Sequence, residues 1–194
     1  MSVYRQAIHG WERRLAGRDR NRLVQPFEWG LEWLGEPPAP DQDAAAAVER
    51  HVAAALADSD RYFSYQSPQD FRLAGDLLSF TSPLAGRYPE NNTVWARYLP
   101  AKNSRRAVVL LPQWNADAAG HVGVGRLRTW FGIPALRLSL PYHDRRKPAG
   151  LERADYHMSS NVGRTIHACR QAAVDARSCL DWLAGQGYET LGIL

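Results

Sequence analysis

The sequence predicts an α/β protein, with a helical N-terminal extension or cap over residues 1–74 and a sheet-forming core over residues 75–194. In the core, an antiparallel edge pair of strands precedes parallel strands joined by crossover helices. Two observations lead to this prediction. The first third lacks the alternating pattern of strands, whereas short apolar runs follow from Gly75 onward. The order strand, helix, strand then predicts a parallel sheet, because parallel strands need a long crossover connection.

Two helices are predicted in the first third, over residues 4–15 and 44–57. Pro37, Pro38 and Pro40 end any helix between them, because proline lacks a backbone N–H and clashes with the preceding turn. Alanines favour the second helix, and Asp41 or Asp43 can cap its start. The region shows no chemical motif, so its residues leave open whether it caps a site or packs around the sheet.

Five strands are predicted from apolar runs bounded by turn residues. They cover residues 76–81, 93–99, 107–111, 135–140 and 190–194. The first two are expected to form the antiparallel edge pair. The third is a continuous apolar run too short for a helix, as expected of a strand buried on both faces. A helix over residues 118–131 is predicted to connect the third strand to the fourth.

The clearest predicted helix covers residues 162–184 and should pack on the sheet. Its apolar stripe comprises Val162, Ile166, Cys169, Ala173, Ala176, Leu180 and Leu183, at spacings of three and four. Arg164, Gln171, Asp175 and Ser178 are predicted to point elsewhere. Ser159, Ser160 or Asn161 can cap the start of this helix, and Gly185 or Gly187 can end it.

The composition, with 45% hydrophobic residues, fits one domain with a sizeable core or most of a larger one. No apolar run approaches the roughly 20 residues of a membrane span, and no signal peptide is recognisable, so the expected location is cytoplasmic, with no membrane partner. Cys169 and Cys179 lie about 15 Å apart on one helix, too far for a disulfide.

Three segments carry a resemblance to a known family: residues 89–94 (PENNTV), residues 111–117 (LPQWNAD) and residues 140–146 (LPYHDRR). With the strand order, they resemble the α/β-hydrolase superfamily, and more narrowly the bacterial relatives of the α/β-hydrolase domain-containing 18 family. The resemblance covers residues 75–194. It implies a partial α/β-hydrolase sheet whose last strand, residues 190–194, leads to the G-x-S-x-G nucleophile elbow.

In that superfamily, the loop after the third core strand supplies a backbone N–H to the oxyanion hole. The resemblance implies that the loop here is residues 112–115, with Trp114 as the first candidate donor and Gln113 and Asn115 next. The other reading is that Trp114 covers the sheet edge and Asn115 caps a helix. Tyr142 and His143 follow the next strand, where a substrate pocket is expected, although a surface turn is an alternative.

The implied function is that of an N-terminal fragment of a serine hydrolase, acting on an ester, thioester or amide. The triad should then lie beyond Leu194, because the acid and the base follow the nucleophile in chain order. This chain alone is expected to be inactive and unlabelled by a fluorophosphonate at Ser159 or Ser160. In the full-length protein, the expected partner is a small-molecule ester or amide.

No cofactor or metal is expected. Gly120, Gly123 and Gly125 fall short of a dinucleotide motif, since Arg128 replaces the last glycine. No spacing brings His121, His143 and His157 together as metal ligands.

The alternative function is a non-enzymatic binding module for an anionic partner. The formal charge is +4. Two basic clusters would carry such binding: Arg13, Arg14, Arg18 and Arg20, and Arg145, Arg146 and Lys147. No nucleic acid is expected, because the clusters lack interleaved aromatic residues. A third reading is a remnant whose last strand leaves an unpaired hydrophobic edge.

Overall fold

The computed structural model describes residues 3–16, 24–35, 43–116 and 132–194. The helices are α1 (Val3–Ala16), the 3₁₀ turn η1 (Leu31–Trp33), α2 (Ala44–Ala57), α3 (Ser59–Tyr62), α4 (Pro89–Asn92), the 3₁₀ turn η2 (Asp144–Arg146) and α6 (Val162–Gly185). The strands are β1 (Arg72–Ala74), β2 (Leu77–Thr81), β3 (Thr93–Leu99), β4 (Arg106–Leu110), β5 (Ala135–Leu138) and β6 (Thr190–Ile193). The helix predicted over residues 118–131, with Gly120, His121, Gly123 and Gly125, lies outside the described residues.

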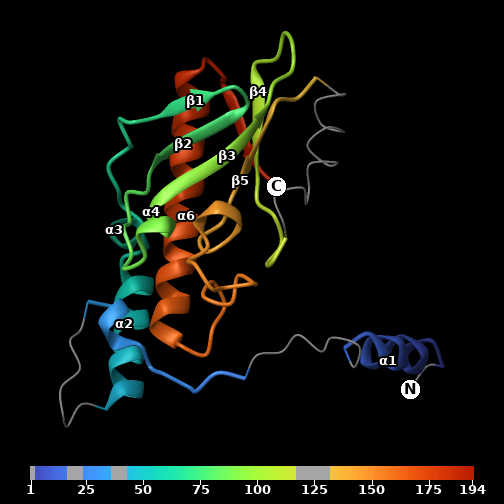
Figure 1. Ribbon diagram of the computed structural model, residues 1–194, viewed down its shortest axis with the longest axis vertical. Coiled ribbons are helices and arrows are strands. Elements are labelled where there is room, and N and C mark those ends of the chain that lie inside the picture. Colours follow the sequence, from blue (N-terminus) through green and yellow to red (C-terminus); the bar gives the residue numbers. More distant parts are fainter. Residues whose placement is uncertain (1–2, 17–23, 36–42, 117–131) are drawn as a thin grey trace.

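The strands form one mixed sheet in the order β1-β2-β3-β5-β4-β6 (Figure 1). The pairs β1·β2, β2·β3 and β3·β5 are antiparallel, whereas β4 is parallel to both β5 and β6. The carboxyl ends of β5, β4 and β6 therefore lie at one edge of the sheet. This topology confirms the predicted fold class, and it is consistent with a partial α/β-hydrolase sheet.

Local sequence accounts for most element boundaries. Asp43 caps α2, since its carboxylate accepts hydrogen bonds from the Ala45 and Ala46 N–H groups. Asn161 caps α6 in the same way through the Arg164 N–H. Gly187, with φ of 88°, provides the left-handed residue after α6. β1 was not predicted, because it has only three residues and all are exposed, so it shows no alternation.

α6 lies against one face of the sheet (Figure 1), and the hydrophobic core is formed by side chains of α6 and of the strands. Leu78, Val94, Val109 and Leu136 of four different strands are completely buried. α6 covers them with Ala176, Cys179, Trp182 and Leu183, among others. A fully buried Leu or Val side chain contributes about 1.5–3 kcal/mol to stability, so the packing of α6 on the sheet is the main source of stability.

The predicted orientation of α6 was wrong for part of its length. Gln171, Asp175 and Ser178 are fully buried, while Cys169 is exposed. The reason is a polar network: Arg146 from η2 is fully buried and pairs with the Asp175 carboxylate at 2.8 Å. The Ser82 hydroxyl donates to the same carboxylate at 2.6 Å. These polar partners allow this face of α6 to point inward. The apolar periodicity of the helix could not predict it, because the partners are distant in sequence.

The N-terminal segment before η1 docks on the start of α6. The Val162 N–H donates to the Glu28 carbonyl and the Gly163 N–H to the Trp29 carbonyl. Gly163 allows this approach, because a Cβ there would lie 1.9 Å from the Gly30 carbonyl oxygen. The sheet itself begins with β1, three residues before the predicted start of the core. The division of the chain into extension and core stays a prediction.

Candidate functional site

The candidate site lies at the sheet edge where β4, β5 and β6 end. The Leu111 N–H donates to the Leu194 carbonyl at 2.8 Å, and the Leu194 N–H donates to the Val109 carbonyl at 2.9 Å. The pairing of β4 with β6 therefore reaches the residue before Pro112. Loops that leave these strand ends meet at this edge, which is where open α/β sheets bind ligands.

The loop after β4 is a tight turn. The Ala116 N–H donates to the Gln113 carbonyl at 3.1 Å, and Asn115, the third residue of this turn, has φ of 60°. A positive φ at that position is typical of a type II turn and favours glycine or asparagine. The turn explains why asparagine follows Trp114.

Three hydrogen bonds tie this turn to the loop after β5. The Trp114 indole N–H donates to the Ala154 carbonyl at 3.2 Å, and the Ala154 N–H donates to the Asn115 side-chain oxygen at 3.1 Å. The Asn115 N–H donates to Nε2 of His143 at 2.9 Å. The Arg153 guanidinium lies 4.9 Å from the centre of a Trp114 ring. The peptide between Trp114 and Asn115 is therefore held by contacts of the residues on both of its sides.

The three predicted oxyanion residues differ in their backbone N–H groups. The Asn115 N–H donates a hydrogen bond to His143, so it is not free to bind a developing oxyanion. In the described part of the chain, the Gln113 and Trp114 N–H groups have no hydrogen-bond acceptor. Preorganised N–H groups of this kind can stabilise negative charge on a substrate oxygen.

The predicted pocket residues Tyr142 and His143 are almost completely buried, and contacts within the chain hold both side chains. Tyr142 has φ of 63°, and its N–H donates to the Asn91 side-chain oxygen at 2.9 Å. Its ring contacts Tyr88 and Tyr156, and burial raises the pKa of its phenol to about 12. Together with Asn91, these contacts fix the strained turn that follows β5.

A neighbouring ion pair supports the same turn. The Asp144 carboxylate, itself buried, accepts hydrogen bonds from Arg137 at 3.1 Å and from the Ser139 hydroxyl at 2.7 Å. Asp144 also has a positive φ, 50°. Between this turn and the loop after β4 lies a pocket of about 190 Å³, lined by Asn115, Ala116, Tyr142, His143, Asp144, Lys147, Glu152 and Ala154.

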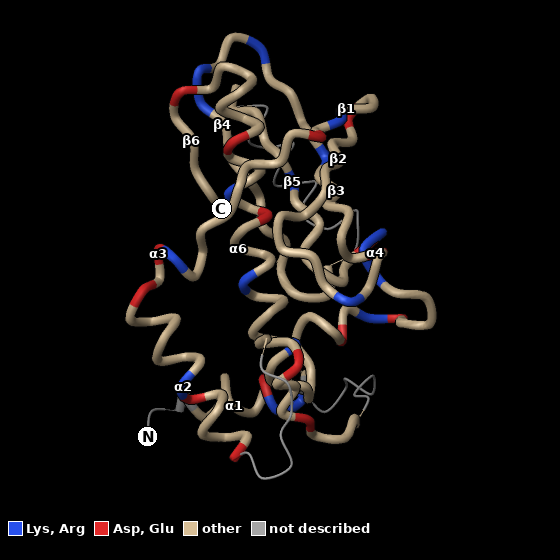
Figure 2. Tube along the Cα trace, turned by 90° about the vertical axis from the view of Figure 1, so that its left-hand side faces the viewer, with Lys and Arg blue, Asp and Glu red and all other residues tan. Residues whose placement is uncertain are grey.

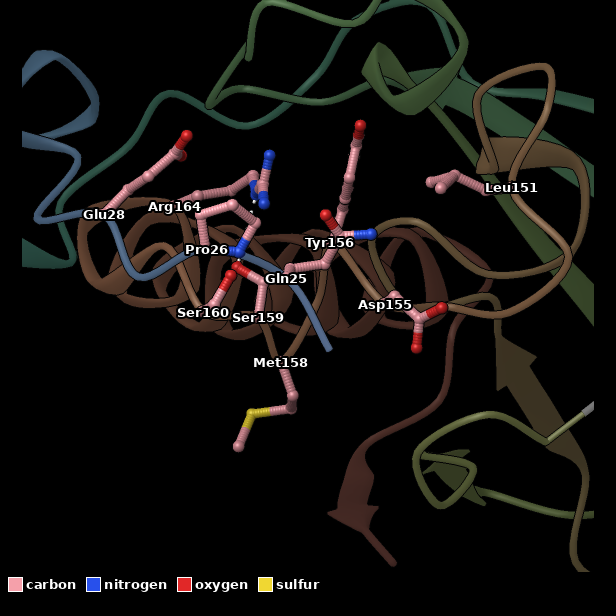
Figure 3. Close-up of a pocket in the computed structure, with 10 residues that line it drawn as sticks. All are labelled: Gln25, Pro26, Glu28, Leu151, Asp155, Tyr156, Met158, Ser159, Ser160 and Arg164. Atoms are coloured by element: carbon pink, nitrogen blue, oxygen red, sulfur yellow. Dashed lines mark hydrogen bonds between the residues drawn. The ribbon is translucent and has the colours of Figure 1, made fainter. Parts of the chain in front are cut away.

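A second pocket, of about 260 Å³, lies at the start of α6 between the N-terminal segment and the loop before α6 (Figure 3). Arg164 forms its basic side: the guanidinium lies 3.9 Å from the Tyr156 ring centre and donates to the Ser159 hydroxyl at 3.3 Å. Glu28 and Asp155 line the same pocket. The pocket therefore carries charges of both signs and favours neither an anionic nor a cationic ligand.

Complete catalytic machinery is absent from the described residues. No described serine hydroxyl or cysteine thiol is hydrogen-bonded to a histidine ring, the arrangement that activates a nucleophile. Cys179 is buried, and burial raises the pKa of its thiol, which disfavours the reactive thiolate. Three or more metal-ligating side chains do not converge anywhere in the described ranges. None of the described helices is long and apolar enough to cross a membrane.

In the described part of the chain, one of the basic residues predicted to bind an anionic partner is buried. Arg146 is buried and paired with Asp175, which removes it from the cluster with Arg145 and Lys147. Arg13 and Arg14 lie on the exposed α1, and Arg18 and Arg20 lie outside the described residues. Figure 2 shows acidic residues interspersed with basic ones along the trace.

No functional role was predicted for Asn91 or Ala154, although each links two loops of the site. Asn91 lies in the PENNTV segment, but its contacts with Tyr142 and Arg146 join residues more than fifty positions apart. Ala154 acts through its backbone, which leaves no signal in the residue type.

The strand order and hydrogen bonds define a mixed six-stranded α/β sheet, which is consistent with a partial α/β-hydrolase sheet. No protein-family model matches the chain, and no curated protein matches it. Among solved structures, it is similar to a PEG-bound complex of a novel cold-adapted esterase from an Arctic intertidal metagenomic library, at 20% identity and a TM-score of 0.36. The similarity covers 67% of this chain and 54% of that chain. The fold assignment rests on the strand order and hydrogen bonds given above.

Proposed function

We propose that this chain forms the oxyanion-hole half of a serine hydrolase that transfers the acyl group of a small ester, thioester or amide to water. One observation carries the proposal: β4 and β6 end side by side, joined by the hydrogen bond from Leu111 to Leu194. In a serine hydrolase of this class, the nucleophile sits on the turn that follows such a strand, beside the oxyanion loop.

In this proposal, residues 112–115 are the oxyanion loop. The N–H groups of Gln113 and Trp114 are the donors, and Trp114 remains the first candidate. Developing negative charge on the substrate carbonyl would be stabilised there, an effect for which a single donor accounts for about 10²–10³ in kcat. The nucleophile, the acid and the base belong to residues that follow Leu194, so no described side chain acts as the general base.

The test compares two polypeptides: the 194-residue chain and the product of the complete reading frame that contains it. Both are treated with a fluorophosphonate probe, which reacts with an activated serine. The longer product should be labelled on a serine within the segment following β6, and the 194-residue chain should not be labelled. Stoichiometric labelling of the 194-residue chain at Ser159 or Ser160 would contradict the proposal, as would an unlabelled, folded longer product.

A matched pair of variants then addresses the loop in the longer product. Gln113→Pro removes one N–H donor, whereas Gln113→Ala changes only the side chain. The proposal expects a large loss of kcat in the first variant and a small one in the second. Equal activity in the two variants would exclude the Gln113 N–H as a donor and leave Trp114.

A further inference from the structure

We infer that His143 is a positioning residue that holds the oxyanion loop in place, and that it does so as the neutral imidazole protonated on Nδ1. This assignment rests on the proposed function, and it differs from a role in contacting substrate. His143 reaches across from the turn after β5 to the turn after β4, and both of its ring nitrogens are engaged by backbone groups.

The two backbone partners determine which nitrogen carries the proton. Nδ1 lies 2.9 Å from the Pro141 carbonyl oxygen, which can only accept a hydrogen bond, so Nδ1 must be the donor. Nε2 lies 2.9 Å from the Asn115 nitrogen, whose N–H can only donate, so Nε2 must carry no proton. Only one of the two neutral tautomers satisfies both contacts, and the imidazolium satisfies only the first.

The contact acts on the loop at its most constrained residue. Asn115 has φ of 60°, and its side-chain oxygen is held by the Ala154 N–H. The hydrogen bond to His143 fixes the peptide between Trp114 and Asn115, and with it the direction of the neighbouring Trp114 N–H. A misplacement of such a donor by about 1 Å is costly in catalysis, because the donors must be aimed before charge develops.

The surroundings of His143 favour the neutral ring. His143 is only 2% exposed, and burial lowers its pKa from the ordinary value. The hydrogen bond to the Pro141 carbonyl and the Asp144 carboxylate act in the opposite direction, whereas the guanidinium groups of Arg146 and Arg137 lower the pKa further. His157 lies edge-on at 5.2 Å between ring centres. Lys147 and Glu152 complete the adjoining pocket wall. The contact should therefore hold at neutral pH and weaken in acid, when Nε2 gains a proton facing the Asn115 N–H.

The first test is a long-range ¹H–¹⁵N NMR spectrum of the ¹⁵N-labelled 194-residue chain at pH 7.5, with His143 assigned by comparison with His143→Gln. We expect His143 to be neutral and protonated on Nδ1. As the pH is lowered, its protonation should move the Trp114 indole and Asn115 amide signals with the same midpoint. A ring protonated on Nε2, or loop signals that do not follow its titration, would overturn the inference.

The second test is hydrogen exchange at the Asn115 amide, measured relative to the amides of β4. His143→Leu removes the acceptor, so the Asn115 amide should exchange about five- to tenfold faster, the effect of losing one hydrogen bond. His143→Gln places an oxygen near the position of Nε2 and should restore most of the protection. His157→Gln is the control, since His157 does not bond to Asn115, and it should leave the rate unchanged.

Unchanged protection in folded His143→Leu would contradict the inference. Because these readouts are spectroscopic, their failure rejects the role of His143 alone. Failure of the fluorophosphonate experiment rejects the hydrolase proposal and, with it, the oxyanion role of the loop, but leaves the contact between His143 and Asn115 in place.

Discussion

The Leu111 N–H donates a hydrogen bond to the Leu194 carbonyl oxygen at 2.8 Å, across the parallel pair β4 and β6. This bond brings the end of β6 next to Leu111, the residue before the loop 112–115 that contains Trp114. An oxyanion hole needs its N–H donors next to the attacking nucleophile, so this adjacency is the geometric basis of the proposed function.

Breaking the buried ion pair between Arg146 and Asp175 is predicted to destabilise the fold strongly. Arg146→Met leaves the Asp175 carboxylate without its cation inside the core, so the free energy of unfolding should fall by about 3–5 kcal/mol. Urea denaturation monitored by circular dichroism measures this loss. The control is Arg97→Met, because the Arg97–Asp76 pair is about half exposed and should contribute about 0–1 kcal/mol. Equal losses in the two variants would contradict the role assigned to burial.

Two glycines of α6 should respond to alanine in opposite directions. A Cβ at Gly163 would overlap the Gly30 carbonyl oxygen, so Gly163→Ala should displace the N-terminal segment and destabilise the chain by at least about 2 kcal/mol. A Cβ at Gly185 meets nothing within 4 Å, so Gly185→Ala should stabilise it by up to about 1 kcal/mol. Thermal unfolding of both variants checks the prediction, which fails if Gly163→Ala is neutral.

Stability is predicted to fall as the pH drops below about 6.5. Burial is the main cause that lowers the pKa of His157 to about 4, and the neighbouring His143 acts in the same direction. Between these values the unfolded chain binds a proton that the folded chain does not, so each pH unit costs about 1.4 kcal/mol. Unfolding free energies measured from pH 7.5 to pH 4.5 should show a shallower slope for His157→Gln. An unchanged slope would rule out His157 as a source of this pH dependence. His9→Gln, on the exposed α1, is the control.

The two cysteines should differ sharply in reactivity. Cys169 is exposed and Cys179 is buried. A thiol reagent such as Ellman's reagent is expected to modify one thiol per folded chain, and the second only after denaturation. Cys169→Ser should abolish the fast reaction. Two fast thiols in the folded chain would show that α6 is packed differently on the sheet.

The sequence was sufficient for those parts of the fold that depend on local patterns. β3 was predicted with its correct ends, because turn residues bound an alternating run, and α2 began where Asp43 can cap it. The buried face of α6 was only partly predicted. Asp175 and Gln171 face inward because Arg146 and Asn91, distant in sequence, supply their partners.

The candidate site shows the same division between local and distant information. The strands that precede Trp114 and Tyr142 were predicted from local patterns. The contact of Asn115 with His143 joins residues 28 positions apart through a backbone N–H, which no residue type reveals. Tyr142 and His143 lie in the turn after β5, which ends at Leu138, and their side chains are buried in contacts within the chain.

The most direct measurement of the central claim is to read the coding DNA past codon 194. The account predicts an open frame that completes G-x-S-x-G within a few codons, which would place a serine nucleophile on the turn after β6, beside Trp114. A stop codon at that position, or a continued frame without a serine in that turn, would contradict it.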